Sequence, residues 1–275
     1  MNAETGDTAP DAAPEEEIQG DEINDKEMPL LEHLAELRKR LVWSVATFVL
    51  AFIVCYHFAP VLYNFLAAPL AHALKARGEK PELIYTALFE AFFTYVKIAA
   101  FSAAFISFPV VATQIWLFVA PGLYKKERRA LLPFLIVTPV LFFAGGAVAY
   151  YGFFPVMFKF FLSFQNTTPG ADVQIALMAK VSDYLNTTMK VIFAFGLSFE
   201  LPVLLTLLGK VGIVTSAGLK KYRRYAYVGC FVMAAVLAPP DVPSQCMMAA
   251  LLIGLFEISF FTVRMVEPKP VVENA

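Results

Sequence analysis

The chain has 275 residues, of which 59% are hydrophobic, 16% are charged and 27 are Phe. A soluble domain of this length could not bury so much apolar surface, which excludes an ordinary soluble globular protein and indicates that lipid is the solvent. The net charge of −1 conceals an asymmetry, because residues 1–27 carry ten acids and one base, or −9, whereas the other 13 acids and 21 bases give +8. We therefore expect a cationic body in the membrane and an acidic tail.

Residues 1–27 are rich in Asp, Glu, Ala and Pro and contain almost no large apolar side chains. Such a composition cannot offset the entropy lost on ordering, so we expect this tail to be disordered. A secretory signal peptide begins with a basic region, and the acidic start of this chain excludes one.

The next stretch, Met28–Leu41, reads MPLLEHLAELRKRL and has the periodicity of a helix. Its leucines at 30, 34, 37 and 41 fall on one stripe, and its charges fall opposite them. This pattern predicts an amphipathic N-terminal helix that lies in the membrane interface and runs directly into the first span.

We expect an all-α integral membrane protein in which residues 28–264 form a six-span domain and 265–275 a short cytoplasmic tail. The expected spans are 41–59, 98–120, 130–158, 191–209, 225–238 and 246–263. Arg38, Lys39 and Arg40 precede the first span, which predicts a cytoplasmic N-terminus. With six spans both termini lie inside, and the expected inner segments then hold 15 Lys and Arg residues against five in the outer loops.

Several features of the spans predict a bent scaffold. Prolines at 109, 133, 139, 155 and 202 free carbonyls and kink helices, and Gly145-Gly146 is expected to interrupt the third span. The last two spans look short, since 14 residues rise about 21 Å against an apolar layer of about 30 Å. Either the bilayer is thinned locally or the true helices extend beyond the apolar runs. Outside the membrane, Pro60–Leu88 is amphipathic enough to cap the outer surface.

Enzyme signatures are missing from the sequence. It contains no HExxH, its three histidines are widely dispersed, and Ser198 lacks a G-x-S-x-G context. Glycine-rich phosphate loops are also absent. We therefore expect a non-enzymatic protein without catalytic residues, metal or cofactor.

Two acidic residues fall inside expected spans, where an unpaired charge costs at least about 2.5 kcal/mol. Glu200, in FGLSFELPV, has Ser198 and the helix-interrupting Pro202 beside it, which favours a functional polar site over a structural carboxyl group. For Glu257, in GLFEISFF, the two interpretations stay open.

Two further acids lie at the expected cytoplasmic interface among bases. Glu36 can pair with Arg40 four residues on, and Glu127 can be neutralised by its basic neighbours in KKERR, each for a few tenths of a kcal/mol. Alternatively, both acids receive cations from another molecule. This alternative gains support because both segments already hold surplus bases.

Five motifs, in this order among the spans, resemble TatC, the multi-spanning component of the bacterial twin-arginine protein translocase. They are HLAELRKRL, APGLYKKERR, FGLSFELPV, APPDVPSQ and LFEISFF. The resemblance covers roughly Met28–Arg264. It implies a multi-pass protein of the bacterial cytoplasmic membrane that recognises signal peptides with two adjacent arginines and exports folded proteins with the proton-motive force.

The resemblance also implies roles for particular residues. Signal-peptide recognition would involve Glu36, Arg38, Leu41, Phe118, Lys125, Glu127 and Arg129. Glu200 would be an intramembrane polar site, and contacts with partners or other subunits would involve Met233, Asp241, Gln245 and Glu257. The implied partners are single-span TatA- and TatB-type proteins, with a homo-oligomer inside a larger complex, and no nucleic acid.

Two other functions remain open from the residues. A proton-coupled secondary transporter could use Glu200 or Glu257, but such folds favour an internal repeat, and none is visible in the sequence. A membrane scaffold without transport activity is the other alternative.

Overall fold

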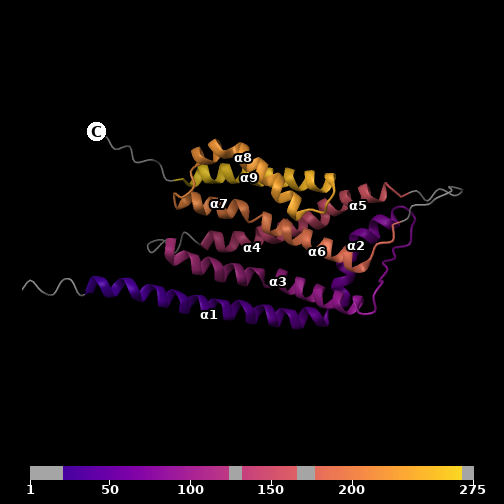
Figure 1. Cartoon of the computed structure of the whole chain (residues 1–275), viewed down its shortest axis with the longest axis horizontal. Helices are drawn as coiled ribbons and strands as arrows, with labels where there is room; N and C mark the ends of the chain where they lie inside the picture. The colour runs from indigo at the N-terminus through magenta and orange to yellow at the C-terminus, as the bar shows by residue number, and fades with distance from the viewer. Residues whose placement is uncertain (1–20, 124–131, 166–176, 268–275) are drawn as a thin grey trace, which may run out of the picture.

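The structure, a computed structural model, describes residues 21–123, 132–165 and 177–267, and side chains within 34–118, 133–165 and 177–267. These ranges are helical and contain no β-strand, apart from an isolated bridge between Ile84 and Lys180 (Figure 1). The elements are α1 (Asp21–His57), α2 (Ala59–Lys75), α3 (Glu90–Leu123), α4 (Leu132–Ala147), the π-helix η2 (Val148–Phe153), α5 (Phe154–Leu162), α6 (Val181–Ser198), α7 (Leu201–Lys210), α8 (Ser216–Leu237) and α9 (Val242–Val266). The predicted all-α class is confirmed.

Five segments of the described residues are long and apolar enough to cross a membrane. They are Leu34–His57, Glu90–Phe118, Pro133–Leu162, Val181–Lys210 and Val242–Val266. The segment expected at 225–238 lies in α8, a 22-residue helix that begins with the basic stretch SAGLKKYRR. The span expected at 225–238, the fifth in chain order, therefore remains a prediction.

The expectation of two short C-terminal spans was wrong for the last one. Helix α9 has 25 residues and rises about 37 Å, because it begins before and ends after the apolar run. Asp241 caps its first turn and Pro243 occupies a position that needs no N–H donor. The pattern of apolar residues located the helix correctly and underestimated its length.

The N-terminal helix is continuous. Helix α1 begins at Asp21 and passes without a break through the expected interfacial helix into the first span. Residues 21–27, expected to be disordered, are therefore helical, while 1–20 lie outside the described residues. Glu22, Lys26 and Glu27 favour helix, and an existing helix can extend through a polar segment at little cost.

The two ends of the helical bundle differ in what they contain (Figure 1). At one end, which we call the terminal end, lie the start of α1, the end of α9 and the end of α3. At the other, the far end, α2 packs against α3 and α5, beside the start of α6. The two described chain termini thus lie at the same end, whereas their side of the membrane remains a prediction. The amphipathic cap expected around Pro69 is the helix α2.

The expected kinks occur at two prolines. Just before Pro155 the chain forms η2, in which the Phe154 N–H donates to the Ala149 carbonyl five residues back. A proline in the next turn lacks an N–H and crowds the carbonyl four residues earlier, which the wider π-turn relieves. Pro202 likewise separates α6 from α7.

Gly145 and Gly146 do not interrupt the third span as expected, because both lie within α4. They allow α4 to approach α6 closely. A Cβ atom at Gly145 would lie 2.6 Å from the Phe195 carbonyl oxygen and 2.9 Å from the Gly196 Cα. Small residues that bring backbones together are typical of helix contacts in membranes.

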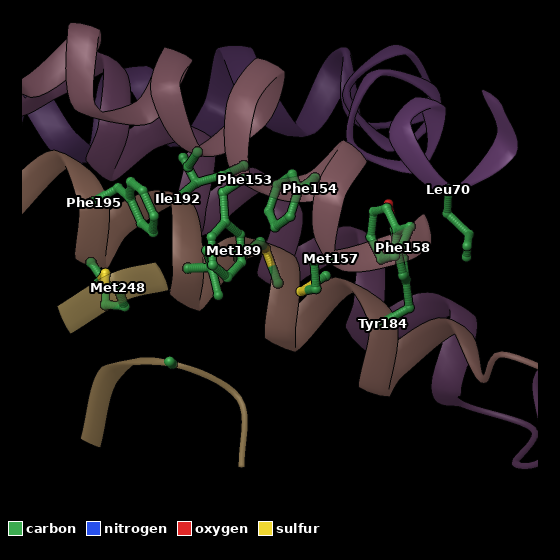
Figure 2. Close-up of a cluster of buried hydrophobic side chains, with 14 of the residues drawn as sticks. Leu70, Phe153, Phe154, Met157, Phe158, Tyr184, Met189, Ile192, Phe195 and Met248 are labelled. Carbon is green, nitrogen blue, oxygen red and sulfur yellow. The ribbon is translucent and has the colours of Figure 1, made fainter. Parts of the chain in front are cut away.

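The main core is built around α6 (Figure 2). Side chains from η2 and α5, including Phe153 and Phe154, face Met189 and Phe195 of α6. Helix α1 is joined to α3 by a smaller cluster built on Cys55, Ala99 and Ala103. Helix α6 is therefore central and α1 peripheral.

Candidate functional site

Glu36 lies on α1 near the terminal end and is paired within its own helix. The Arg40 Nε donates to Glu36 Oε1 at 3.0 Å, and the Arg40 Nη2 donates to the same oxygen. The Arg40 Nη1 also reaches Gln114 Oε1 on α3, at 3.4 Å. The local ion pair expected as one alternative is therefore formed, and it also joins α1 to α3.

The pairing of α1 with α3 fixes what lies opposite Glu36. The two helices run in opposite directions (Figure 1), and Arg40 is level with Gln114. Phe118 lies one turn beyond Gln114, on the same face of α3, and is therefore about level with Glu36. Its side chain is half-buried.

Of the seven residues expected to recognise a signal peptide, four have described side chains. Glu36, Arg38 and Leu41 lie on α1 and Phe118 lies on α3; Arg38 is exposed, and Leu41 is 59% exposed. Lys125, Glu127 and Arg129 lie outside the described residues. Among the residues described, α1 and α3 thus bring Glu36 and Phe118 to the same level.

Glu200 stands where α6 gives way to α7. Its Oε1 is buried and has no hydrogen-bond partner among the described residues. The Thr138 side chain of α4 lies against Glu200, and Thr138 Oγ1 accepts a hydrogen bond from Trp116 Nε1 of α3 at 3.0 Å. Because Trp116 supplies the proton of that bond, the Thr138 hydroxyl hydrogen is available to the carboxyl group. Polar groups from two helices, α3 and α4, thus lead to Glu200.

Local sequence explains why the helix breaks here. Pro202 has no N–H to offer the Ser198 carbonyl, so the ladder of i→i−4 bonds stops, and the Glu200 N–H bonds to Leu197 three residues back. The Ser198 hydroxyl donates to the Ala194 carbonyl at 2.6 Å. The Ser198 hydroxyl is therefore used within α6. The helix break leaves the Glu200 carboxyl group beside the Thr138 side chain.

Glu257 is engaged in a compact cluster between α8 and α9. Arg223 Nε donates to Glu257 Oε1 at 2.7 Å, its Nη2 donates to Glu257 Oε2, and the Tyr227 hydroxyl donates to Oε1 at 2.5 Å. A bidentate pair with Arg fixes the relative position of two helices. The structural interpretation of Glu257 is thus the one that this geometry favours.

The other residues expected to contact partners lie along α8 and at the start of α9. Asp241 caps α9, because its Oδ1 accepts the Ser244 N–H at 2.7 Å, while its Oδ2 is buried without a partner among the described residues. Gln245 is half-buried in the same turn, and Met233 on α8 is 51% exposed. Asp241 therefore has a structural role, and partner contacts remain predictions.

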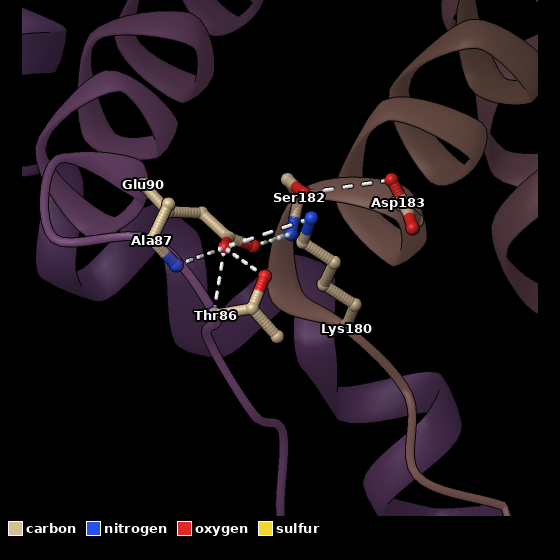
Figure 3. A network of polar contacts seen from close by, with 6 residues as sticks. All are labelled: Thr86, Ala87, Glu90, Lys180, Ser182 and Asp183. Carbon is tan, nitrogen blue, oxygen red and sulfur yellow. Dashed lines mark hydrogen bonds and ion pairs between the residues drawn. The ribbon is translucent and has the colours of Figure 1, made fainter.

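Sequence reasoning missed Glu90, the first residue of α3 (Figure 3). Its Oε2 accepts the Thr86 N–H at 2.9 Å and the Ala87 N–H at 3.3 Å, its Oε1 accepts the Ser182 N–H at 3.2 Å, and Lys180 Nζ lies 3.9 Å away. Glu90 thereby joins the starts of α3 and α6 at the far end. A signal existed, since an acid in the first turn before a long apolar run is typical of a helix N-terminus.

The terminal end has a matching contact between α8 and α9. Glu267 Oε2 accepts the Ser216 N–H at 3.0 Å, and Thr215 Oγ1 accepts the Gly218 N–H at 3.1 Å. Hydrogen bonds from the Ser216 side chain and backbone hold the pKa of Glu267 below its ordinary value. Across the described part of the chain, no three His, Cys, Asp or Glu side chains gather in a way that could hold a metal ion.

Comparison with known proteins agrees with this arrangement. Residues 32–250 match the model of the family described as Sec-independent protein translocase protein (TatC). The chain belongs to the TatC family. Among curated relatives, TatC of Magnetococcus marinus is 49% identical over 251 residues, 91% of this chain and 89% of the relative. TatC of Rickettsia prowazekii is 40% identical over 237 residues, 86% of this chain and 92% of the relative.

A solved structure has the same fold. A crystal structure described as the twin-arginine translocase receptor TatC matches with a TM-score of 0.73 and 35% identity, over 85% of this chain and 99% of that one. The resemblance read from the five motifs is therefore confirmed. The TatC chain described here is a component of the Sec-independent protein translocase, and it is a membrane protein.

Proposed function

We propose that this TatC chain is the translocase subunit that binds twin-arginine signal peptides at the cytoplasmic face. It organises single-span TatA- and TatB-type partners to export folded proteins with the proton-motive force. The observation that carries the proposal is Glu36, a carboxylate near the surface of α1 that already holds an arginine side chain, level with the aromatic ring of Phe118.

Glu36 can exchange one arginine for another. Both Arg40 nitrogens that reach it donate to Oε1, which leaves Oε2 for a further donor. A guanidinium presents a planar fork that a carboxylate accepts well, whereas a lysine ammonium is a hydrated point charge. Arg40 keeps a second contact on Gln114, so a signal arginine can take its place on Glu36.

Glu127 supplies the second carboxylate of this proposal. It follows Leu123, the last described residue of α3, by four residues, a distance that extended chain covers in at most about 14 Å. Helix α3 ends at the terminal end, where α1 carries Glu36 (Figure 1). In this proposal Lys125, Arg129 and the exposed Arg38 of α1 supply positive charge that disfavours other cations, while the exposed Leu41 offers an apolar contact for the peptide.

In this proposal both termini lie in the cytoplasm of a bacterium and α8 is the fifth of six spans through the inner membrane. The single-span partners pack along α8, whose apolar face is open. Its exposed side chains include Val228, Phe231, Val232, Met233 and Val236. Asp241, Gln245 and Glu257 lie at or near the same pair of helices, and Glu200 provides a polar site within the membrane. Several copies of the chain assemble in the complex.

The test is binding of a fluorescent twin-arginine signal peptide to the purified full-length protein in nanodiscs. Because a charged hydrogen bond contributes about 1.5–3 kcal/mol, Glu36→Gln and Glu127→Gln should each weaken binding about tenfold or more. A twin-lysine peptide should bind weakly to every variant. Glu82→Gln, an exposed acid at the far end, is the matched control and should leave affinity unchanged.

Arg40→Gln separates two roles of Glu36. If Glu36 receives the signal arginine, removal of its internal competitor preserves or tightens peptide binding. If Glu36 acts merely by holding Arg40, then Arg40→Gln weakens binding as much as Glu36→Gln does. That second result, or unchanged affinity in Glu127→Gln, would contradict the proposed receptor site.

A further inference from the structure

A cavity of about 620 Å³ opens at the far end, between α2 and the segment formed by η2 and α5. Its walls are mainly apolar and aromatic, with Pro69 and Ala73 on one side and Tyr150, Tyr151 and Pro155 on the other. The volume lies within the range of about 300–1,000 Å³ that ligand sites occupy. Peptide recognition, proposed for the terminal end, does not use this cavity.

Three nitrogen-bearing side chains line the same cavity, each from a different segment. His72 comes from α2, Arg77 from the turn that follows it, and Lys159 from the last turn of α5. The cavity lining includes no Asp or Glu. The charges of Arg77 and Lys159, with no acid in the lining of an apolar hollow, indicate a ligand that is both anionic and apolar.

The position of Arg77 is built into the end of α2. The Glu79 N–H bonds to the Leu74 carbonyl and the Gly78 N–H to the Lys75 carbonyl, which is the pattern of a Schellman motif. It requires a positive φ at Gly78, observed at 77°. The Arg77 Nη1 donates to the Leu162 carbonyl at the end of α5, so the guanidinium is fixed across the cavity with nitrogens to spare.

The aromatic wall is also fixed before any ligand arrives. The Tyr150 hydroxyl donates to the Phe65 carbonyl of α2 at 2.8 Å, and the two rings stack with centroids 4.5 Å apart. Tyr151, next to it, is 72% exposed, as is common for tyrosines at a membrane surface. A preformed site loses little entropy when it binds a ligand.

We propose that this cavity binds one anionic phospholipid, with its phosphate on Arg77 and Lys159 and its apolar part along Ala73, Tyr151 and Pro155. The cavity adjoins the end of the segment Pro133–Leu162, long and apolar enough to span, so lipid headgroups meet it at the membrane surface. Arg binds phosphate oxygens through two parallel N–H donors. A free anion would leave the apolar walls unused, and a zwitterionic lipid would not match the excess of cations.

The test uses native mass spectrometry of the purified full-length protein, titrated with phosphatidylglycerol or with phosphatidylcholine of the same acyl chains. We expect one tight phosphatidylglycerol site. The double variant Arg77→Gln/Lys159→Gln should weaken it about tenfold or more, since it removes charged hydrogen bonds. The matched control, Lys75→Gln/Lys80→Gln, removes two neighbouring cations that do not line the cavity and should bind as the unaltered chain does.

A second variant tests the apolar walls. Ala73→Phe fills the hollow and leaves Arg77 and Lys159 in place, so it should also abolish the tight site, and inorganic phosphate should not displace the lipid. Equal binding of the two lipids, equal loss in both double variants, or displacement by millimolar phosphate would each overturn the proposal. Labelling of Cys55 and Cys230, which are buried, shows whether each variant is folded.

Discussion

The two helical segments that carry the candidate carboxylates are surrounded very differently. In the apolar part of α1, the helix that carries Glu36, 6% of the residues are buried. In the segment formed by α6 and α7, which carries Glu200, 50% of the residues are buried. Helix α1 packs mainly against α3, with a smaller contact to α2. The segment α6–α7 contacts α3, α4, α8 and α9.

This difference separates two ways in which an acid can serve a membrane protein. On a peripheral helix, a carboxylate held by one flexible side chain can exchange that partner for a ligand. In a central segment, contacts with several helices fix the surroundings of the carboxyl group. Its hydrogen-bond partners must therefore come from the neighbouring helices. The contrast predicts stability effects at the centre and binding effects at the periphery.

A large loss of stability is expected where α4 and α6 meet. Gly145→Ala places a methyl group 2.6 Å from the Phe195 carbonyl oxygen, and because backbone cannot swing aside, the helices must separate. We expect a loss of about 3 kcal/mol, at the upper end of overpacking costs. The loss of stability is measured by thermal unfolding in detergent. Unfolding is monitored through thiol labelling of the buried Cys55 and Cys230 in a Cys246→Ser background.

The control for this substitution is Gly254→Ala on α9, where a methyl group would meet nothing within 4 Å. Its stability should not fall, since alanine favours helix over glycine. If both alanine variants unfolded alike, the close approach of α4 and α6 would not be what stabilises the centre.

Substitutions at and beside Glu200 should change transport while the protein stays folded. Glu200→Gln keeps the size of the side chain and removes its capacity to take up and release a proton, so we expect peptide affinity within twofold of normal and loss of most transport into membrane vesicles. Thr138→Val removes the hydroxyl that lies between Trp116 and Glu200 and should lower transport in the same direction. Loss of peptide binding in Glu200→Gln would instead move Glu200 into the recognition site.

Much of the fold could be predicted, because lipid makes hydropathy and charge strong signals. The apolar runs located five of the six expected spans, and Pro155 and Pro202 marked real breaks. Helix ends were less accurate, since α1 and α9 continue through polar residues that cost a helix little. Gly145 was misread because a glycine that breaks a helix and one that admits a neighbour look the same in sequence.

The candidate site was predicted less completely, and for a physical reason. Glu36 and Glu200 stood out because a charge near or within lipid needs an explanation. Glu90 did not, because its partners Lys180 and Ser182 are some ninety residues away and meet it only in the folded chain. The pairing of Glu257 with Arg223 could likewise not be predicted, since the two residues are 34 positions apart in sequence and lie on different helices.

The smallest effect is expected on the open face of α1. Leu50 is 67% exposed, so Leu50→Ala should change stability by less than about 0.5 kcal/mol. The same substitution at Leu185 of α6, which is 1% exposed, removes buried methyl groups and should cost about 2–5 kcal/mol. Both are measured by thiol labelling during thermal unfolding. Comparable losses would contradict this contrast and show that α1 is covered in the purified protein, because nothing within the described part of the chain packs on Leu50 closely enough to account for such a loss.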